Sequence, residues 1–186
     1  VRGEIHSRVP QTAIEEVGKT IRTIAEDEHG KLWFGTDNGV SAFDGRRFTA
    51  FSEAEGLGKG IVWASTTDKF GRLWFATQYS GVSLLENGRF RSFSTKDGLG
   101  GEYAYALLSD SKGNLWIGHR GAGVTRCIPD KEKGLRDCHR MTKADGLAHD
   151  EVRAIVETRD GAIWFGTRGG GISKWDGTNF TTYTTA

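Results

Sequence analysis

Four segments of this chain are near-copies of one another, and each is centred on the pattern Gly-x-Leu/Ile-Trp. Their tryptophans, at positions 33, 74, 116 and 164, are 41, 42 and 48 residues apart. A repeat of this length is typical of proteins assembled from one supersecondary unit that recurs along the chain. The repeat therefore constrains the fold more strongly than any other feature of the 186 residues.

Each repeat contains four short runs of β-branched and aromatic residues, separated by turns rich in glycine, aspartate and asparagine. Runs of this kind predict β-strands, and no segment shows a helical period of usable length. The dipeptides Asp44-Gly45, Asn87-Gly88 and Asp176-Gly177 predict tight hairpins between strands. Four antiparallel strands in about 40–45 residues form one blade of a β-propeller.

We therefore predict an all-β chain, a β-propeller with four four-stranded antiparallel blades. The expected segments are an N-terminal lead-in at 1–19 and blades at 20–58, 59–100, 101–148 and 149–186. A large flat indole buries much area between stacked sheets, so the repeated tryptophans are expected to pack between neighbouring blades and not to bind a ligand. This structural set is Trp33, Trp74, Trp116 and Trp164.

The third repeat is longer than the others because ten residues, 128–137, separate its third and fourth strands, where the other repeats have four. Cys127 and Cys138 flank this insertion and take the places of an apolar cross-strand pair. Facing positions on paired strands bring Cβ atoms within reach of a disulfide with local twist. We predict a disulfide, which would indicate an oxidising compartment, while two free thiols remain the alternative.

Composition excludes several classes of function. A net charge of +1 gives no overall field that favours nucleic acid or an anionic membrane, so neither partner is expected. No apolar run approaches the roughly 18–20 residues that span a bilayer. No phosphate-cradling glycine motif opens a helix, so no cofactor is expected. The chain begins at Val1 with neither methionine nor a signal-peptide core, which is expected of a processed chain or of a piece of a larger one.

The combined pattern resembles the two-component regulator propeller repeat. The shared elements are Asp-x-x-Gly-x-Leu-Trp-x-Gly-Thr, a following Gly-x-Ser-type run, a hairpin with phenylalanine, and Asp-Gly-Leu, seen as 55–57, 97–99 and 145–147. The resemblance covers about residues 20–186. The departures are Ala76 for glycine, His119 for threonine and Thr158 for the turn aspartate, and the fourth repeat stops before its Asp-Gly-Leu.

The resemblance implies an extracytoplasmic sensor, periplasmic or secreted, of the kind that gut-dwelling bacteria place ahead of a membrane segment and a histidine kinase. It also implies a ligand, commonly a glycan, that is bound without chemical conversion. A looser similarity to streptogramin lyases implies the same fold, but no catalytic residue of that family can be carried over onto matched positions here. A propeller that serves as a structural or protein-interaction module remains the main alternative.

The number of blades raises a question of closure, because the unpaired flanks of the first and fourth blades would be large apolar surfaces. Two chains related by a twofold axis could close an eight-bladed ring as a homodimer. One chain could instead close a four-bladed ring, as hemopexin-like domains do. The third alternative is that the chain is a fragment of a larger ring.

Residues that differ between repeats on the ligand-facing side are the candidate binding residues. They lie in the turns between second and third strands (37–38, 78–80, 119–120, 168), in the connections between blades (59, 103, 149–151) and near the start of each innermost strand. Aromatic rings could stack on sugar faces, and guanidinium groups would suit anionic sugars. The candidates are Arg22, Trp63, Tyr79, Tyr103, Tyr105, His119, Arg120, His149, Arg153 and Arg168.

Evidence for catalysis or for a metal is weak in the sequence. The only catalytic-looking group is His119, His149 and Asp150, and neither hydrogen-bond reach nor a tuned pKa can be assigned to it from the sequence. The Asp-x-x-Gly turns lack the dense oxygen spacing of a calcium site, so the aspartates are expected to form turns and no metal is expected. We therefore expect no catalytic residue and a polar small molecule or glycan as the partner.

Overall fold

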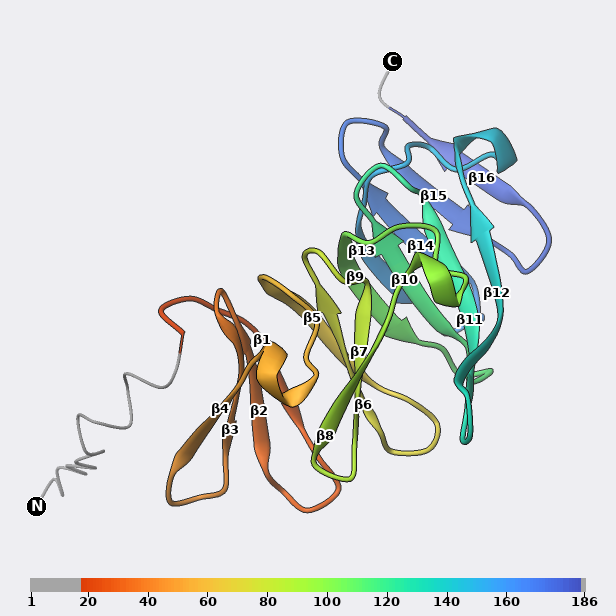
Figure 1. Cartoon of the computed structure of the whole chain (residues 1–186). Coiled ribbons are helices and arrows are strands. Elements are labelled where there is room, and N and C mark those ends of the chain that lie inside the picture. Colours follow the sequence, from red (N-terminus) through yellow and green to blue (C-terminus); the bar gives the residue numbers. More distant parts are fainter. Residues whose placement is uncertain (1–17, 185–186) are drawn as a thin grey trace, which may run out of the picture.

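The computed structural model describes residues 18–184, so most of the expected lead-in at 1–19 lies outside the described residues. The chain forms four four-stranded antiparallel sheets, which confirms the predicted all-β propeller blades. Figure 1 shows the blades in chain order along an arc. The strands are β1 (Ile21–Glu26), β2 (Leu32–Thr36), β3 (Gly39–Phe43), β4 (Phe48–Phe51), β5 (Val62–Thr67), β6 (Leu73–Thr77), β7 (Val82–Glu86), β8 (Arg89–Phe93), β9 (Ala104–Ser109), β10 (Leu115–His119), β11 (Val124–Asp130), β12 (Gly134–Met141), β13 (Val152–Glu157), β14 (Ile163–Thr167), β15 (Ile172–Trp175) and β16 (Phe180–Tyr183).

Each sheet is a simple meander whose first strand is innermost, so that β1, β5, β9 and β13 lie side by side along the inner edge of the arc. Short 3-10 turns, η2 (Glu53–Glu55), η3 (Thr95–Asp97) and η4 (Lys143–Asp145), follow the outer strands of the first three blades. Each turn has a capping box and ends at a glycine with positive φ, which only glycine adopts readily. The leucine that comes next, as at Leu57, is buried against the following blade.

Tryptophans form the centre of each junction between blades. Trp33 packs against Phe75 and Phe90 of the second blade, with ring centroids 6.5 and 6.3 Å apart. Trp74 and Trp116 occupy the corresponding apolar clusters between the second and third and between the third and fourth blades. Trp164 also stacks on a ring of its own blade, Tyr183, but it lies at the free flank of the arc, where no described blade follows.

The turn aspartates hold these tryptophans in place. The indole Nε1 of Trp33, Trp74 and Trp116 donates to the carboxylate six residues earlier, at 2.8, 2.9 and 2.8 Å. In the fourth blade Thr158 stands in place of the aspartate, and its hydroxyl donates to the Asp160 carboxylate at 2.5 Å. The Trp164 Nε1 is consequently buried and has no hydrogen-bond partner among residues 18–184.

Cys127 and Cys138 form a disulfide with their Cα atoms 4.1 Å apart. They occupy the ladder position at which Phe43 pairs with Phe48 in the first blade. The residues between them do not form an open loop, because β11 and β12 extend toward one another as a long hairpin with a bulge at Asp137.

Over residues 18–184 the four sheets form an open arc, which argues against the alternative of a closed four-bladed ring. Apolar clusters join consecutive blades, and in the described part of the chain no such cluster joins the fourth blade to the first. Figure 1 shows these two blades at opposite ends of the arc. Within the described residues, no helix is long and apolar enough to cross a membrane.

Candidate functional site

The innermost strands share an irregularity that positions the candidate site. In each blade, one residue near the start of this strand is left out of the pairing with the next strand, which makes a β-bulge. A bulge leaves the extra residue without a ladder partner and re-aims its side chain. The four bulged residues are Arg22, Trp63, Tyr105 and Arg153, all of them sequence-predicted candidates.

These four side chains form a continuous chain of contacts across the blades. The Arg22 guanidinium carbon lies 4.4 Å from the centroid of the Trp63 ring. Trp63 meets Tyr105 edge to face at 5.2 Å, and the Arg153 guanidinium carbon lies 3.7 Å from the Tyr105 centroid. A cation over each outer ring face is favourable because the ring quadrupole attracts positive charge. We call these four residues, with Tyr103, Arg120 and Arg168, the central array.

Tyr103 connects the bulged residues to the loops above them. Its ring centroid lies 4.6 Å from that of Tyr105, and the Arg120 guanidinium carbon lies 5.3 Å from the Tyr103 centroid. Tyr79 packs edge-on against Tyr103 at 6.0 Å, and Gln78 donates to the Tyr103 hydroxyl at 3.0 Å. Burial, with a hydrogen bond from Tyr103, raises the pKa of Tyr105, so its hydroxyl stays protonated at neutral pH.

Glu151 supplies the negative charge next to the array. Its Oε1 accepts from the Arg153 Nε at 2.8 Å and lies 3.5 Å from the Arg168 Nη1. Burial opposes ionisation of Glu151, but its bonds to Arg153 and Arg168 outweigh that effect and hold the pKa below its usual value. The carboxylate is therefore ionised at neutral pH and neutralises only part of the positive charge. Sequence reasoning placed Glu151 in a variable loop but did not find this pairing, which depends on the fold.

The array opens to solvent at its centre. Trp63, Tyr105, Arg153 and Arg168 line a shallow opening of about 650 Å³. The Trp63 Nε1 is buried there, with no hydrogen-bond partner among the described residues. Guanidinium groups beside aromatic faces can bind carboxylate or hydroxyl oxygens while apolar faces of the same ligand stack.

His119 does not belong to the central array, and its expected ligand-binding role is wrong. The side chain is fully buried, and its Nε2 lies 2.8 Å from the Thr125 hydroxyl. Burial, reinforced by the nearby positive charge of Arg140, lowers the pKa of His119 to about 4. The imidazole is thus a neutral structural group. It stands at the position equivalent to Thr77 of the second blade, whose hydroxyl donates to the Gly81 carbonyl.

His149 and Asp150 also serve local structure. The His149 Nδ1 accepts the Glu151 N–H at 2.9 Å, and the Asp150 carboxylate accepts the Lys143 N–H at 2.7 Å, which caps η4. His119, His149 and Asp150 are therefore bound to three separate backbone or side-chain partners and do not assemble as a catalytic group. Among the described residues, no three His, Cys, Asp or Glu side chains gather as a metal-binding group.

Comparisons with known proteins agree with the repeat architecture. The family model for the two component regulator propeller matches residues 16–38, 98–121 and 146–169. An extracellular domain from B. thetaiotaomicron, described as part of a hybrid two component system, aligns at 19% identity over 89% of this chain and 24% of that chain, with a TM-score of 0.71. No curated protein matches the sequence.

Two enzymes share the fold. Virginiamycin B lyase from Staphylococcus aureus aligns at 15% identity over 91% of this chain and 56% of that chain, with a TM-score of 0.65. A gluconolactonase from Xanthomonas campestris aligns at 14% identity over 87% of this chain and 61% of that chain, with a TM-score of 0.60. The chain spans about a quarter of the sensor domain, and these identities carry the fold alone. Three segments of the chain thus match the two component regulator propeller repeat, and all four blades share one architecture.

Proposed function

We propose that this chain is a non-catalytic ligand-binding module of a sensor propeller, and that it binds an anionic carbohydrate or a similar polar ligand at the central array. The observation that carries the proposal is the row formed by Arg22, Trp63, Tyr105 and Arg153, in which two adjacent rings lie between two guanidinium groups. These residues come from four different blades, so the binding surface exists only when the blades are assembled.

The charge of the array favours an anionic ligand. Arg153 and Arg168 share one carboxylate, Glu151, while Arg120 lies over Tyr103 without an ion pair among the described residues. A ligand carboxylate can therefore be bound without displacing Glu151. The rings of Trp63 and Tyr105 line the same opening, next to the guanidinium groups that lie over them.

Binding of acidic oligosaccharides tests this proposal. Calorimetric titration with uronic-acid oligosaccharides should show saturable binding that Trp63→Ala and Arg153→Ala each weaken by about tenfold, the cost of about one stacking or charge-assisted contact. Arg46→Ala, an exposed arginine in the β3–β4 hairpin, is the matched control and should bind as the parent does. Unchanged affinity in both array variants would refute the site. Equal affinity for neutral oligosaccharides would refute the preference for an anionic ligand.

An extracytoplasmic location, periplasmic or secreted, is part of the same proposal. The Cys127–Cys138 disulfide supports it, because disulfides persist mainly in oxidising compartments. The similarity of the fold to an extracellular sensor domain agrees with this location. Signalling would then be carried out by parts of a sensor other than these blades. Labelling with a membrane-impermeant reagent in intact cells would test the location.

A second candidate function is assembly into a closed ring, which we propose as an eight-bladed homodimer. The two ends of the arc look like the two halves of one junction. Val62, Ala104 and Val152 are fully buried against the preceding blade, whereas their equivalent Ile21 is 40% exposed. At the other end, a Cβ added to Gly166 would meet only Ala154 of its own blade, whereas one at Gly118 would meet Val152 of the next blade.

Solution mass measured by light scattering over a range of concentrations tests this assembly. The homodimer predicts twice the chain mass, with dissociation on dilution. Ile21→Lys should weaken the dimer, because it places a charge where the equivalent valines are buried. Lys96→Glu in the exposed η3 turn is the control. A monomer at every concentration would eliminate the homodimer and favour a fragment of a larger ring.

A further inference from the structure

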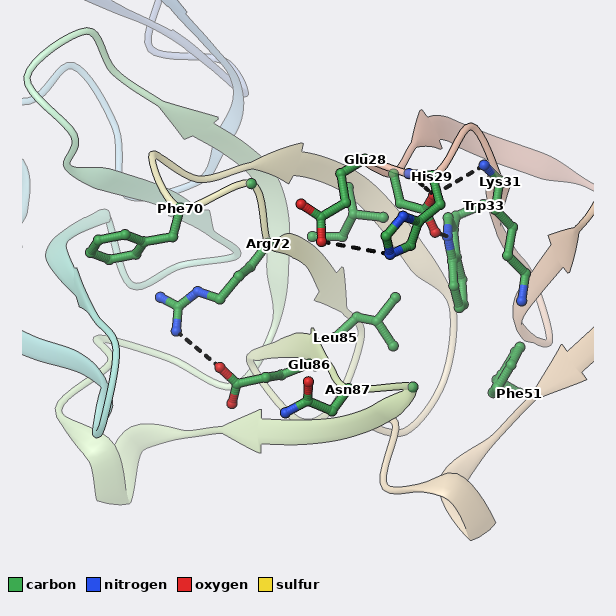
Figure 2. A pocket seen from close by; sticks show the side chains of 14 residues that line it. Glu28, His29, Lys31, Trp33, Phe51, Phe70, Arg72, Leu85, Glu86 and Asn87 are labelled. Carbon is green, nitrogen blue, oxygen red and sulfur yellow. Dashed lines mark hydrogen bonds and ion pairs between the residues drawn. The ribbon is translucent and has the colours of Figure 1, made fainter.

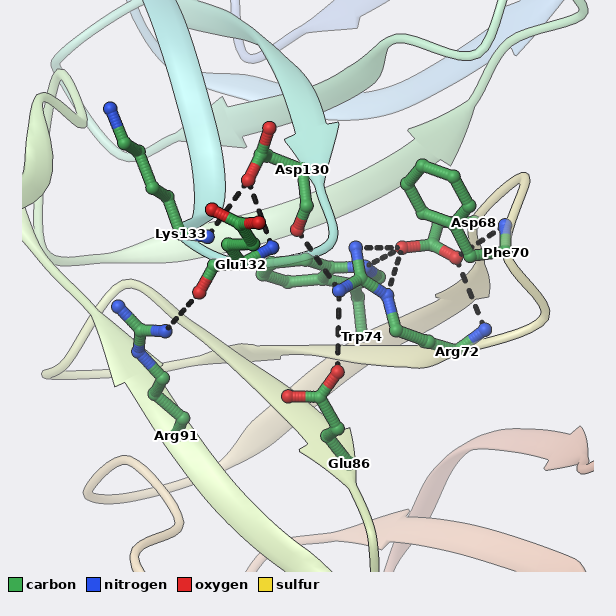
Figure 3. Close-up of polar contacts among 9 residues, drawn as sticks. All are labelled: Asp68, Phe70, Arg72, Trp74, Glu86, Arg91, Asp130, Glu132 and Lys133. Atoms are coloured by element: carbon green, nitrogen blue, oxygen red, sulfur yellow. Dashed lines mark hydrogen bonds and ion pairs between the residues drawn. The ribbon is translucent and has the colours of Figure 1, made fainter.

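The long β11–β12 hairpin of the third blade docks on the second blade. The Arg72 Nη1 donates to the Asp130 carbonyl at 3.1 Å, and the Arg91 Nη1 donates to the Glu132 carbonyl at 3.4 Å. Figure 3 shows the Arg72 guanidinium held between Asp68, Glu86 and this carbonyl. The second blade thus recognises the backbone of an extended segment with two guanidinium groups.

Apolar contacts complete this docking. Leu135 is buried in the cluster that contains Trp74 and Phe93. Gly134 lies so close to the Phe93 ring that an added Cβ would be 2.2 Å from its Cζ. The Lys131 ammonium lies 5.3 Å from the centroid of Phe70. The hairpin therefore fills the groove between the second and third blades with the Leu135 side chain, the backbone at Gly134 and the Lys131 ammonium over Phe70.

The first blade presents an equivalent groove that no described segment fills. Figure 2 shows the residues that line this groove between the first and second blades. Its volume is about 450 Å³, whereas the groove between the third and fourth blades has about 80 Å³. The β7–β8 hairpin of the second blade turns at Asn87-Gly88 and does not reach across it. Four residues of the first blade line one side of the groove: His29, Lys31, Trp33 and Phe51. They stand at the positions that Phe70, Arg72, Trp74 and Phe93 hold in the second blade, where the hairpin docks.

The groove is acidic. Glu28 and Glu86 have side chains that are 72% and 42% exposed, and Asp27 forms part of the floor. Arg72 is already paired with Asp68 at 2.8 Å and lies 3.5 Å from Glu86, so Lys31 is the lysine or arginine of this groove that has no ion pair among the described residues. The Lys31 ammonium lies 4.8 Å from the Trp33 centroid, on the surface that corresponds to the one covered by the hairpin. An occupant with basic side chains would complement this charge.

We propose that the groove between the first and second blades binds an extended, basic segment of a protein partner, in the way that the β11–β12 hairpin binds the neighbouring groove. One aliphatic side chain of the partner takes the place that the Lys31 ammonium now holds over the rings of Trp33 and Phe51. Lys31 swings off the ring to donate to a backbone carbonyl, as Arg72 does. A lysine or arginine of the partner meets Glu28 and Glu86. Main-chain bonds supply affinity in this mode, and the side-chain contacts supply specificity.

The chain itself provides a probe. A disulfide-closed peptide with the sequence of residues 127–138 carries three basic and three acidic side chains, and Glu132→Lys in the peptide makes it basic. We expect fluorescence anisotropy to show saturable binding of the Glu132→Lys peptide to the whole chain, about threefold to tenfold tighter than the unaltered peptide. Leu135→Asp in the peptide should abolish binding, because a carboxylate cannot enter the aromatic contact.

Variants of the protein locate the site. Glu28→Lys and Lys31→Met should each weaken the Glu132→Lys peptide by about threefold to tenfold, and both are surface changes that a near-ultraviolet spectrum can show to be folded. Lys112→Glu in the groove between the third and fourth blades is the matched control. The proposal would be overturned if neither groove variant changed the affinity for the peptide, or if the Leu135→Asp peptide still bound. Arg153→Ala should not affect this peptide, so failure here and failure at the central array are distinguishable.

Discussion

His119 should make the stability of this protein depend on pH in a way that a single substitution removes. The imidazole is buried, and the Thr125 hydroxyl, which already accepts the Gly100 N–H at 2.9 Å, can donate to its Nε2. Protonation would place a charge in the core and compete with this bond. His119→Thr installs the residue found at the equivalent positions of the other three blades, where the hydroxyl bonds a glycine carbonyl.

The magnitude follows from linkage between protonation and folding. The pKa of His119 falls from 6.5 to about 4 on folding, so between these values the unfolded chain binds more protons than the folded chain. The free energy of unfolding must therefore rise with pH across this window. The contribution of neutral His119 is fully present above about pH 6.5 and is lost as the pH falls toward 4. At 1.36 kcal/mol per pKa unit, the full loss is about 3 kcal/mol.

Urea unfolding followed by tryptophan fluorescence at about pH 7, 6, 5 and 4 measures this loss. Carboxylates that titrate in the same range contribute to both proteins and cancel in the difference. We expect the parent chain to lose about 3 kcal/mol more than His119→Thr between about pH 7 and 4, whatever the absolute stabilities. Parallel curves for the two proteins would refute the reasoning, because they would mean that His119 is protonated in the folded state without cost.

Three further changes test the structural argument. Thr158→Asp should stabilise the fourth blade by about 1 kcal/mol in urea unfolding, because it restores the acceptor that Trp164 lacks, and no gain would show that this indole N–H needs no partner. Reducing the Cys127–Cys138 bond should cost about 2–3 kcal/mol by releasing a short loop, and an unchanged melting temperature would contradict that estimate. Arg72→Ala should cost about 3 kcal/mol, since it leaves a buried aspartate unpaired, and a cost below about 1 kcal/mol would refute the pairing.

Much of the fold could be predicted from the sequence because the repeat recurs in register. The Leu-Trp run has the same structural role in the first three blades, so an uncertain assignment in one copy is corrected by comparison with the others. The bulge position could also be found, because it is the place near the start of each inner strand where the repeats disagree. Cys127 and Cys138 were recognised from the same alignment, since they replace a pair that is apolar in the other blades.

Other features depend on packing that the sequence pattern does not encode. His119 looks like a loop residue in the alignment, yet its hydrogen bond to Thr125 and its burial place it in the core. The insertion at 128–137 gives no sign that it folds back on the second blade, because the contacts involve its backbone carbonyls. Glu151 pairs with Arg153 and Arg168 only once the fourth blade is folded.

The inner bulge is where this repeat can change without loss of the fold. At the neighbouring ladder position, Val62, Ala104 and Val152 are buried by the preceding blade, so a change of size there costs packing energy. The bulged residue has no partner in the ladder, and in the second, third and fourth blades its side chain lines the central opening. Selection for binding can therefore act on this position in every blade, independently of selection for stability. Two arginines, a tryptophan and a tyrosine at these positions form a surface for an anion with an apolar face.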